Sequence, residues 1–255
     1  MACRRHLGFG WLVVFLAALI GALPDAAIAQ SLPLISSTTK GGTTEFSVPI
    51  QTLLTLTALS FLPAALVLMT SFTRIIIVFA LLKQALGLQT APPNIVLVGL
   101  ALFLTLFIMS PIFDEIYRTA YAPLANGSIN FEQAVESAGK PLKLFMLNNT
   151  GTDELRLFSN LYPAGPVERD NVPFQVLVPA FAMSEIKAGF IIGFLIYLPF
   201  IAIDLAVASV LTSLGMIMVS PMMFSLPVKL IIFVLADGWT LLGASLIASF
   251  PPPPS

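Results

Sequence analysis

Hydrophobic residues in this chain gather in long stretches that contain few or no charged positions. Four such stretches follow residue 50, and they cover Leu53–Met69, Ile95–Phe113, Gly189–Leu211 and Leu230–Phe250. Their lengths are close to the roughly 20 apolar residues that a helix needs to cross a bilayer. The pattern therefore predicts an all-α, multi-pass membrane protein.

The polar segments around these stretches divide the chain into parts. We expect a flexible periplasmic tether over 30–50, a first apolar helical hairpin over 51–113, a periplasmic helical module over 114–184, a second apolar helical hairpin with a Met-rich loop over 185–250, and a tail over 251–255. Within the module, Asn130 followed by Gln133 is typical of a reciprocally capped helix start, and predicts a helix to about Leu147.

The first 29 residues have the pattern of a cleaved signal peptide. Arg4 and Arg5 precede an apolar run from Gly10 to Leu23, and small residues end at Ala29. This order of basic, apolar and small residues predicts cleavage between Ala29 and Gln30. An uncleaved first membrane helix is the alternative, although the apolar run is short for a membrane span.

Composition supports the membrane prediction. Hydrophobic residues make up 57% of the chain and charged residues 10%, with a mean hydropathy of +0.95. Soluble domains carry about 25% charged residues, so lipid or other apolar subunits must cover much of this surface. The net charge of -1 identifies no partner. The absence of a basic stretch argues against nucleic-acid binding.

The inventory of reactive side chains argues against catalysis. The single cysteine, Cys3, and the single histidine, His6, both lie in the predicted signal peptide. The remaining chain has no thiol nucleophile, no imidazole base and none of the usual zinc or haem ligands. We therefore expect neither an enzyme nor a cofactor or metal site.

Orientation follows from the positive charges between the first two apolar stretches. If the mature N-terminus lies outside the cytoplasm, the segment holding Arg74 and Lys83 forms a short cytoplasmic loop. Cytoplasmic loops are enriched in lysine and arginine, so the two residues agree with this topology. Both ends of the mature chain are then expected outside.

Charged residues inside the apolar stretches are candidate functional groups. Asp204 and Asp237 lie in the last two stretches, and Lys229 precedes Asp237 by eight residues, too far along a helix for direct contact. Pairing between segments or chains would make them assembly contacts, whereas a proton or ion relay is the alternative. Glu185 and Lys187 are expected either in salt bridges at the membrane rim or as a solvated pair.

Two further patterns predict packing and a flexible surface. Gly189 and Gly193 lie one helical turn apart, which lets helix backbones approach closely. Met216, Ile217 and Met218 follow the helix-breaking Gly215 and occupy a bend. Methionine adapts to irregular surfaces, so this loop is predicted to be an adaptable contact or a buried loop.

Several motifs resemble a known protein family. They lie at Ser71–Ile75, Gln84–Gln89, Pro92–Asn94, Leu100–Thr105, Pro179–Ile186, Pro199–Phe200, Ile203–Leu205, Leu226–Leu230 and Asp237–Trp239. In this order, over about Leu53–Phe250, they resemble the FliP family of flagellar biosynthetic proteins.

The resemblance implies an assembly function in the bacterial inner membrane, at the flagellar basal body. Members of the family assemble in several copies with FliQ, FliR and other membrane proteins of the export apparatus. The assembly is the pore of the type III export gate, through which unfolded flagellar proteins pass. The resemblance also implies long bent hairpins and a pore gasket at Met216, Ile217 and Met218, with Ile217 in place of a third methionine.

Two other function classes stay open. An ion or solute carrier would use Asp204 and Asp237 as coupling sites and is expected to show an internal repeat of its membrane segments, which the sequence does not display. A membrane enzyme would need a nucleophile and a base, and no such pair is evident.

Overall fold

The computed structural model describes residues 36–40, 43–47, 56–57, 60 and 67–250, except 164, 166, 168 and 217–219. The chain divides into two units at residues 63 and 64. In the first unit, β1 (Ser36–Lys40) pairs antiparallel with β2 (Thr43–Ser47), and Lys40 lies opposite Thr43. This hairpin falls within the predicted tether and was not predicted. The predicted cleavage site at Ala29 and Gln30 and the tail at 251–255 lie outside the described residues.

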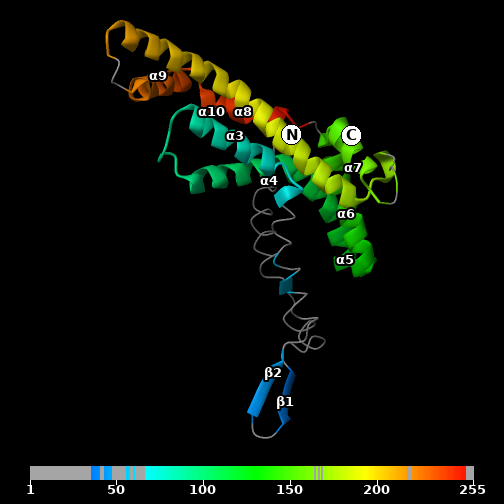
Figure 1. Ribbon diagram of the computed structural model, residues 1–255. Helices are drawn as coiled ribbons and strands as arrows, with labels where there is room; N and C mark the ends of the chain where they lie inside the picture. Colours follow the sequence, from blue (N-terminus) through cyan, green and yellow to red (C-terminus); the bar gives the residue numbers. More distant parts are fainter. Residues whose placement is uncertain are drawn as a thin grey trace, which may run out of the picture. The chain divides into compact units, whose positions relative to one another are not determined.

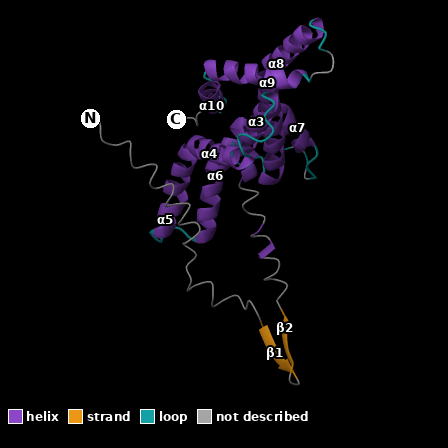
Figure 2. Cartoon of the chain, turned by 90° about the vertical axis from the view of Figure 1, so that its left-hand side faces the viewer, coloured by secondary structure: helices purple, strands orange, loops and turns teal. Residues whose placement is uncertain are grey.

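The described residues of the second unit form helices and connecting loops (Figure 1), which Figure 2 distinguishes by colour. The helices are α3 (Phe72–Ala85), α4 (Asn94–Ile116), the π-helix η1 (Tyr117–Tyr121), α5 (Ala122–Ala125), α6 (Phe131–Asn149), α7 (Thr152–Asn160), the 3-10 helix η2 (Arg169–Asn171), α8 (Phe174–Ser213), α9 (Pro221–Leu235) and α10 (Gly238–Ala248). The prediction of an all-α membrane protein is confirmed for this unit.

Two of the helical segments are long and apolar enough to cross a membrane. They are Asn94–Ala125 and the 40-residue helix α8, and the pair α9 and α10, bent by 64°, makes a third if it counts as one span. At 1.5 Å per residue α8 is about 60 Å long, twice the hydrocarbon thickness of a bilayer. The first predicted stretch, Leu53–Met69, lies mostly outside the described residues.

Two helices cross the boundaries that the sequence predicted between parts of the chain. Helix α4 runs past residue 113 to Ile116, and α8 runs without a break through 184 and 185. One hydrophobic core joins α3, α4, α8, α9 and α10, and a second joins α4, α6, α7 and α8. The charge composition changes along α4 and α8 without ending either helix, so the segment predicted to be a periplasmic module shares these helices with the two predicted apolar hairpins.

The helix predicted from Asn130 is confirmed. The Asn130 side chain accepts a hydrogen bond from the Gln133 backbone N–H at 2.9 Å, and the Gln133 side chain accepts one from the Asn130 N–H at 3.1 Å. Reciprocal capping satisfies backbone donors that the first helical turn leaves unpaired. Helix α6 ends at Asn149, two residues beyond the predicted end.

The predicted loop around Arg74 and Lys83 is wrong, because both residues belong to helix α3. Ile75, Val78 and Leu82 recur at helical spacing and are buried in the first core. Burial of this apolar face in the core stabilises the segment as a helix. Arg74 is itself buried, so it provides no loop charge for the topology argument.

Candidate functional site

A buried ion pair joins the first and the longest apolar helices. Arg74 of α3 donates from Nε to Oε2 of Glu185 on α8 at 3.0 Å, and its Nη2 donates to Oε1 of the same carboxylate. Glu185 is fully buried and Arg74 nearly so. A paired guanidinium and carboxylate match each other geometrically, and two buried charges are stable only when so paired.

Arg74 also reaches the end of the last helix. Its Nη1 donates to the backbone carbonyl of Ser249 at 2.9 Å and to the Ser249 hydroxyl at 3.1 Å. The guanidinium carbon lies 3.9 Å from the centre of the Phe250 ring, which allows a cation–π contact. One side chain therefore connects α3, α8 and the segment that follows α10. The sequence pattern predicted Arg74 only as a loop charge; the signal for its buried role was a lone charge directly before an apolar helical run.

Glu185 and Lys187, which were expected either in salt bridges or as a solvated pair, both form salt bridges, but in different surroundings. Glu185 lies in the interior with Arg74, whereas Lys187 is exposed and forms a 2.8 Å ion pair with Glu154 of α7. The hydrogen bond from Lys187 lowers the pKa of the Glu154 carboxyl below its ordinary 4.5. The pair fastens α7 to the side of α8.

A second buried cation closes the α8–α9 hairpin. Lys229 of α9 donates from Nζ to Oδ2 of Asp204 on α8 at 2.6 Å and to the backbone carbonyl of Ala85, the last residue of α3, at 3.0 Å. The Lys229 side chain is 5% exposed and that of Asp204 is 40% exposed. The predicted pairing between segments thus occurs within one chain, and it ties three helices together.

Asp237 occupies the bend between α9 and α10. Its backbone is left-handed, with φ of 50°, and its carboxylate accepts a hydrogen bond from the Thr240 hydroxyl at 3.0 Å. The next residue, Gly238, lies so close to Phe233 that an added Cβ would be 2.3 Å from the ring. Asp237 is exposed, and within the described residues it forms no ion pair.

The two packing glycines lie against α3 of the same chain. A Cβ at Gly193 would be 2.2 Å from Leu81 Cδ1 and 2.9 Å from Leu81 Cβ, and one at Gly189 would be 3.1 Å from Ile77 Cβ. The absence of side chains at these positions lets the two backbones approach. The close helix contact at these glycines is therefore between α3 and α8.

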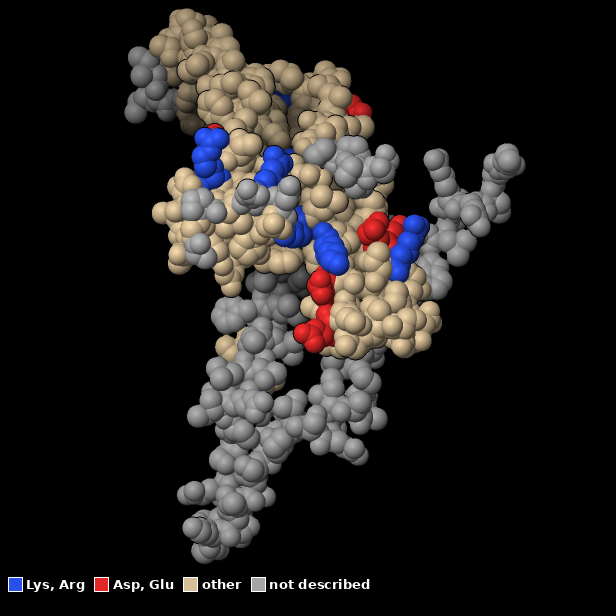
Figure 3. Space-filling view, turned by 90° about the vertical axis from the view of Figure 1, so that its right-hand side faces the viewer, with Lys and Arg blue, Asp and Glu red and all other residues tan. Residues whose placement is uncertain are grey.

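The Met-rich segment lies at the end of the α8–α9 hairpin. Gly215 turns the chain with φ of 78°, and Met216 directly after it is 38% exposed. Ile217 and Met218 lie outside the described residues. Met222 and Met223, in the first turn of α9, are also exposed. In Figure 3 the uppermost part of the face shown carries almost no charged side chain.

The helices of the hairpin expose large apolar side chains over much of their length. Examples are Leu205 and Val210 on α8 and Val234 and Leu235 on α9. Exposed apolar surfaces of this extent indicate contact with lipid or with other subunits. Among the described residues no group of three or more His, Cys, Asp or Glu side chains is arranged to hold a metal ion.

Comparison with known proteins gives consistent matches. The model of the FliP family matches residues 55–246. The flagellar biosynthetic protein FliP of Pectobacterium carotovorum is 48% identical over 248 residues, which cover 97% of this chain and 93% of that protein. The Bacillus subtilis FliP is 48% identical over 79% of this chain and 91% of its own length. The FliP of Buchnera aphidicola from Acyrthosiphon pisum is 52% identical over 89% of this chain, but the match spans only 60% of that longer protein.

Proposed function

Because the chain belongs to the FliP family, as its sequence motifs predicted, we propose that it is a pore-forming core subunit of the flagellar type III protein export gate. In this function several copies assemble with FliQ and FliR in the inner membrane, at the flagellar basal body. Unfolded flagellar proteins pass through the assembly. Family membership also confirms the prediction that the chain is not an enzyme, since the family is a non-enzymatic component of the export gate.

The observation that carries the proposal is the α8–α9 hairpin with its methionine-bearing end. Helix α8 is about twice as long as a bilayer's hydrocarbon core is thick. Beyond the Asp204–Lys229 pair, the hairpin has an uncharged end with exposed methionines. Thioether side chains can change shape around a passing polypeptide, and apolar constrictions exclude water and ions by dewetting. Met216, Ile217 and Met218 of several copies would form such a seal.

The carrier alternative has less support. It needs Asp204 and Asp237 as carboxylates that can exchange a proton or an ion. Asp204 instead neutralises the buried Lys229, which is a structural task. The two carboxylates also lie in different surroundings, one in a hairpin ion pair and the other at an exposed bend.

Complementation tests the function directly. The chain is expressed in flagellated bacteria that lack their own FliP, and secreted hook and filament proteins are measured. Export together with copurification of FliQ and FliR is expected. A chain that reaches the membrane in normal amount but restores no export would contradict the proposal.

Ion leakage tests the seal. Met216→Ala combined with Met218→Ala is expected to raise small-ion conductance while complex yield stays normal. Met183→Ala is the matched control, because Met183 is also exposed on α8 but lies far along the helix from the end of the hairpin. Unchanged conductance with collapsed assembly would show that the loop is a packing element and not a gasket.

A further inference from the structure

Lys83 of α3 and Asp237 at the α9–α10 bend form no ion pair within the described residues, and neither do Asp114 and Glu115 at the end of α4. Arg74 with Glu185, Lys229 with Asp204, and Lys187 with Glu154 form ion pairs. Lys83 of α3 donates only to the neutral Asn94 side chain, at 2.8 Å, and Asp237 accepts only from the Thr240 hydroxyl. Lys83 and Asp237 are thus a cation and an anion that have no ionic partner in the described part of the chain and lie among mostly apolar residues.

Asp237 lies in the middle of an exposed apolar bend. Leu235 is 82% exposed, and Leu241 and Trp239 are also exposed. We call Leu235, Asp237, Trp239 and Leu241 the elbow surface. The Trp239 ring contacts Phe233 edge to face, but its indole N–H has no hydrogen-bond partner among the described residues. A carboxylate and an indole N–H surrounded by apolar side chains are suited to a partner with a cation and a hydrogen-bond acceptor beside an apolar depression.

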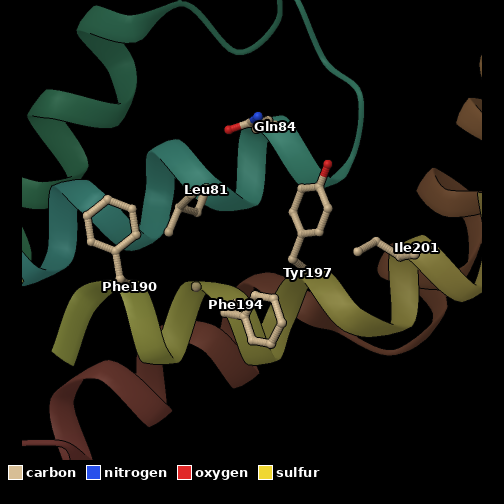
Figure 4. A pocket seen from close by; sticks show the side chains of 7 residues that line it. Leu81, Gln84, Phe190, Phe194, Tyr197 and Ile201 are labelled. Atoms are coloured by element: carbon tan, nitrogen blue, oxygen red, sulfur yellow. The ribbon is translucent and has the colours of Figure 1, made fainter. Parts of the chain in front are cut away.

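A depression of this kind lies between α3 and α8. It has a volume of about 260 Å³ and is lined by Leu81 and Gln84 of α3 and by Phe190, Phe194, Tyr197 and Ile201 of α8. Figure 4 shows Tyr197 rising from α8 toward α3, with Phe190 at one end of the row and Ile201 at the other, and Gln84 on the side of α3 away from α8. We call this the α3–α8 groove. Lys83, which precedes Gln84 in α3, does not line the groove, and its Nζ must leave the Asn94 side chain to pair with a carboxylate at the rim.

One chain can contact one neighbouring copy through its elbow surface and another through its groove at the same time. Phe190, Phe194, Tyr197 and Ile201 follow one another at helical spacing and form one face of α8. Phe200, which packs against Phe233 of α9, lies on another face. The contacts that hold α9 within the chain therefore leave the groove open. Two different complementary surfaces on one chain produce a head-to-tail contact, which closes into a ring when the rotation between copies permits.

We propose that the elbow surface of one copy binds the α3–α8 groove of the next copy, with Asp237 paired to Lys83. Trp239 occupies the groove, and its indole N–H donates to Gln84 or Tyr197. This contact rests on the proposed function, because it specifies how copies of the chain assemble. It gives Lys83 and Asp237 an ionic partner and covers apolar side chains that no described part of the chain covers.

Cross-linking between two tagged copies tests the contact. One copy carries Lys83→Cys and the other carries Asp237→Cys, each with a different epitope tag, and a short bis-maleimide reagent is added to membranes. Cys3 is replaced by serine in both copies, so no other thiol is present. A product that carries both tags is expected only when both variants are present. Lys140→Cys, an exposed lysine on α6, replaces Lys83→Cys in the control and is expected to give no product.

Charge reversal gives an independent measurement. Asp237→Lys alone and Lys83→Asp alone each place like charges together, which is unfavourable, and each is expected to reduce oligomer yield by about tenfold or more. The double variant restores the ion pair and is expected to recover most of the yield. Both residues are at the surface, and unchanged helix content checks that the chain still folds.

The outcomes distinguish failure of this contact from failure of the proposed function. If the unaltered chain forms oligomers and supports export, but neither the cross-link nor the charge-reversal recovery is seen, the contact is wrong and the function stands. Cross-linking of Asp237→Cys to a protein of different mass, independent of Lys83→Cys, would also overturn the contact. If the unaltered chain forms no oligomer, the proposed function itself fails.

Discussion

Arg74 and Glu185, separated by 111 positions in the chain, form a two-point ion pair in the interior of the helical unit. The pair connects α3 to α8, and Arg74 extends the connection to Ser249 at the end of α10. In an apolar surrounding such a pair fixes the register of the helices, because neither charge can be left without the other.

Removal of one partner is therefore expected to destabilise the fold strongly. Glu185→Leu leaves the Arg74 charge buried and unpaired, and a loss of about 3–5 kcal/mol is typical of such a change. Arg74→Met combined with Glu185→Leu removes both charges and is expected to be less destabilising than either single change. Thermal unfolding in detergent measures the difference. A double variant less stable than Glu185→Leu would contradict this account.

The α3–α8 contact at Gly193 gives a steric prediction. Gly193→Ala adds a Cβ 2.2 Å from Leu81 Cδ1 and 2.9 Å from Leu81 Cβ, so α3 and α8 must move apart. Overpacking of this kind typically destabilises by about 1–3 kcal/mol. Gly99→Ala in α4 is the control, because an added Cβ there meets no atom within 4 Å.

A second substitution checks the cause of the Gly193 effect. Leu81→Ala in the Gly193→Ala background removes the Cγ and Cδ atoms that the new methyl group would strike and leaves the Leu81 Cβ at 2.9 Å. It is expected to recover part of the lost stability, measured by the same thermal unfolding. No recovery would mean that Gly193 is required for a reason other than contact with Leu81.

Features set by residues close together in the sequence could be predicted, whereas contacts between distant segments could not. The helix start at Asn130 was predictable because its two hydrogen bonds join residues three positions apart. The long apolar helices follow from composition alone. The pairing of Arg74 with Glu185 was not predictable, since either charge could equally be solvated, and only the packing of α3 on α8 brings them together. For the same reason the glycine spacing indicated a close helix contact but did not indicate that α3 was the partner.

Stability at low pH is expected to depend on Glu154. Its pKa is lowered by the hydrogen bond from Lys187, so the folded state binds this proton less tightly than the unfolded state. The resulting stabilisation is present above the ordinary pKa of 4.5 and is lost as the pH falls through the lowered pKa of the folded state. Because Lys187 is 57% exposed, the contribution is expected to be roughly 0.2–1 kcal/mol.

Glu154→Gln measures this contribution. The difference in unfolding temperature between the unaltered chain and Glu154→Gln is expected near neutral pH and should vanish towards pH 3. Glu136→Gln serves as the control, because the exposed Glu136–Lys140 pair is 3.7 Å long. An undiminished difference at low pH would show that Glu154 stabilises the protein through packing and not through its charge.

Substitution of Asp204 distinguishes a function in assembly from a function as a proton relay. Asp204→Asn keeps an oxygen that can accept from Lys229 but removes the negative charge that balances a side chain only 5% exposed. We expect fewer assembled complexes, while export per assembled complex stays close to that of the unaltered chain. Asp204→Asn combined with Lys229→Gln removes both charges and should recover assembly, because no buried charge is then left unpaired. Quantifying export against complex yield in both variants distinguishes the two functions. A relay requires a carboxylate that binds and releases a proton, so the double variant would assemble normally and export nothing if Asp204 served as one.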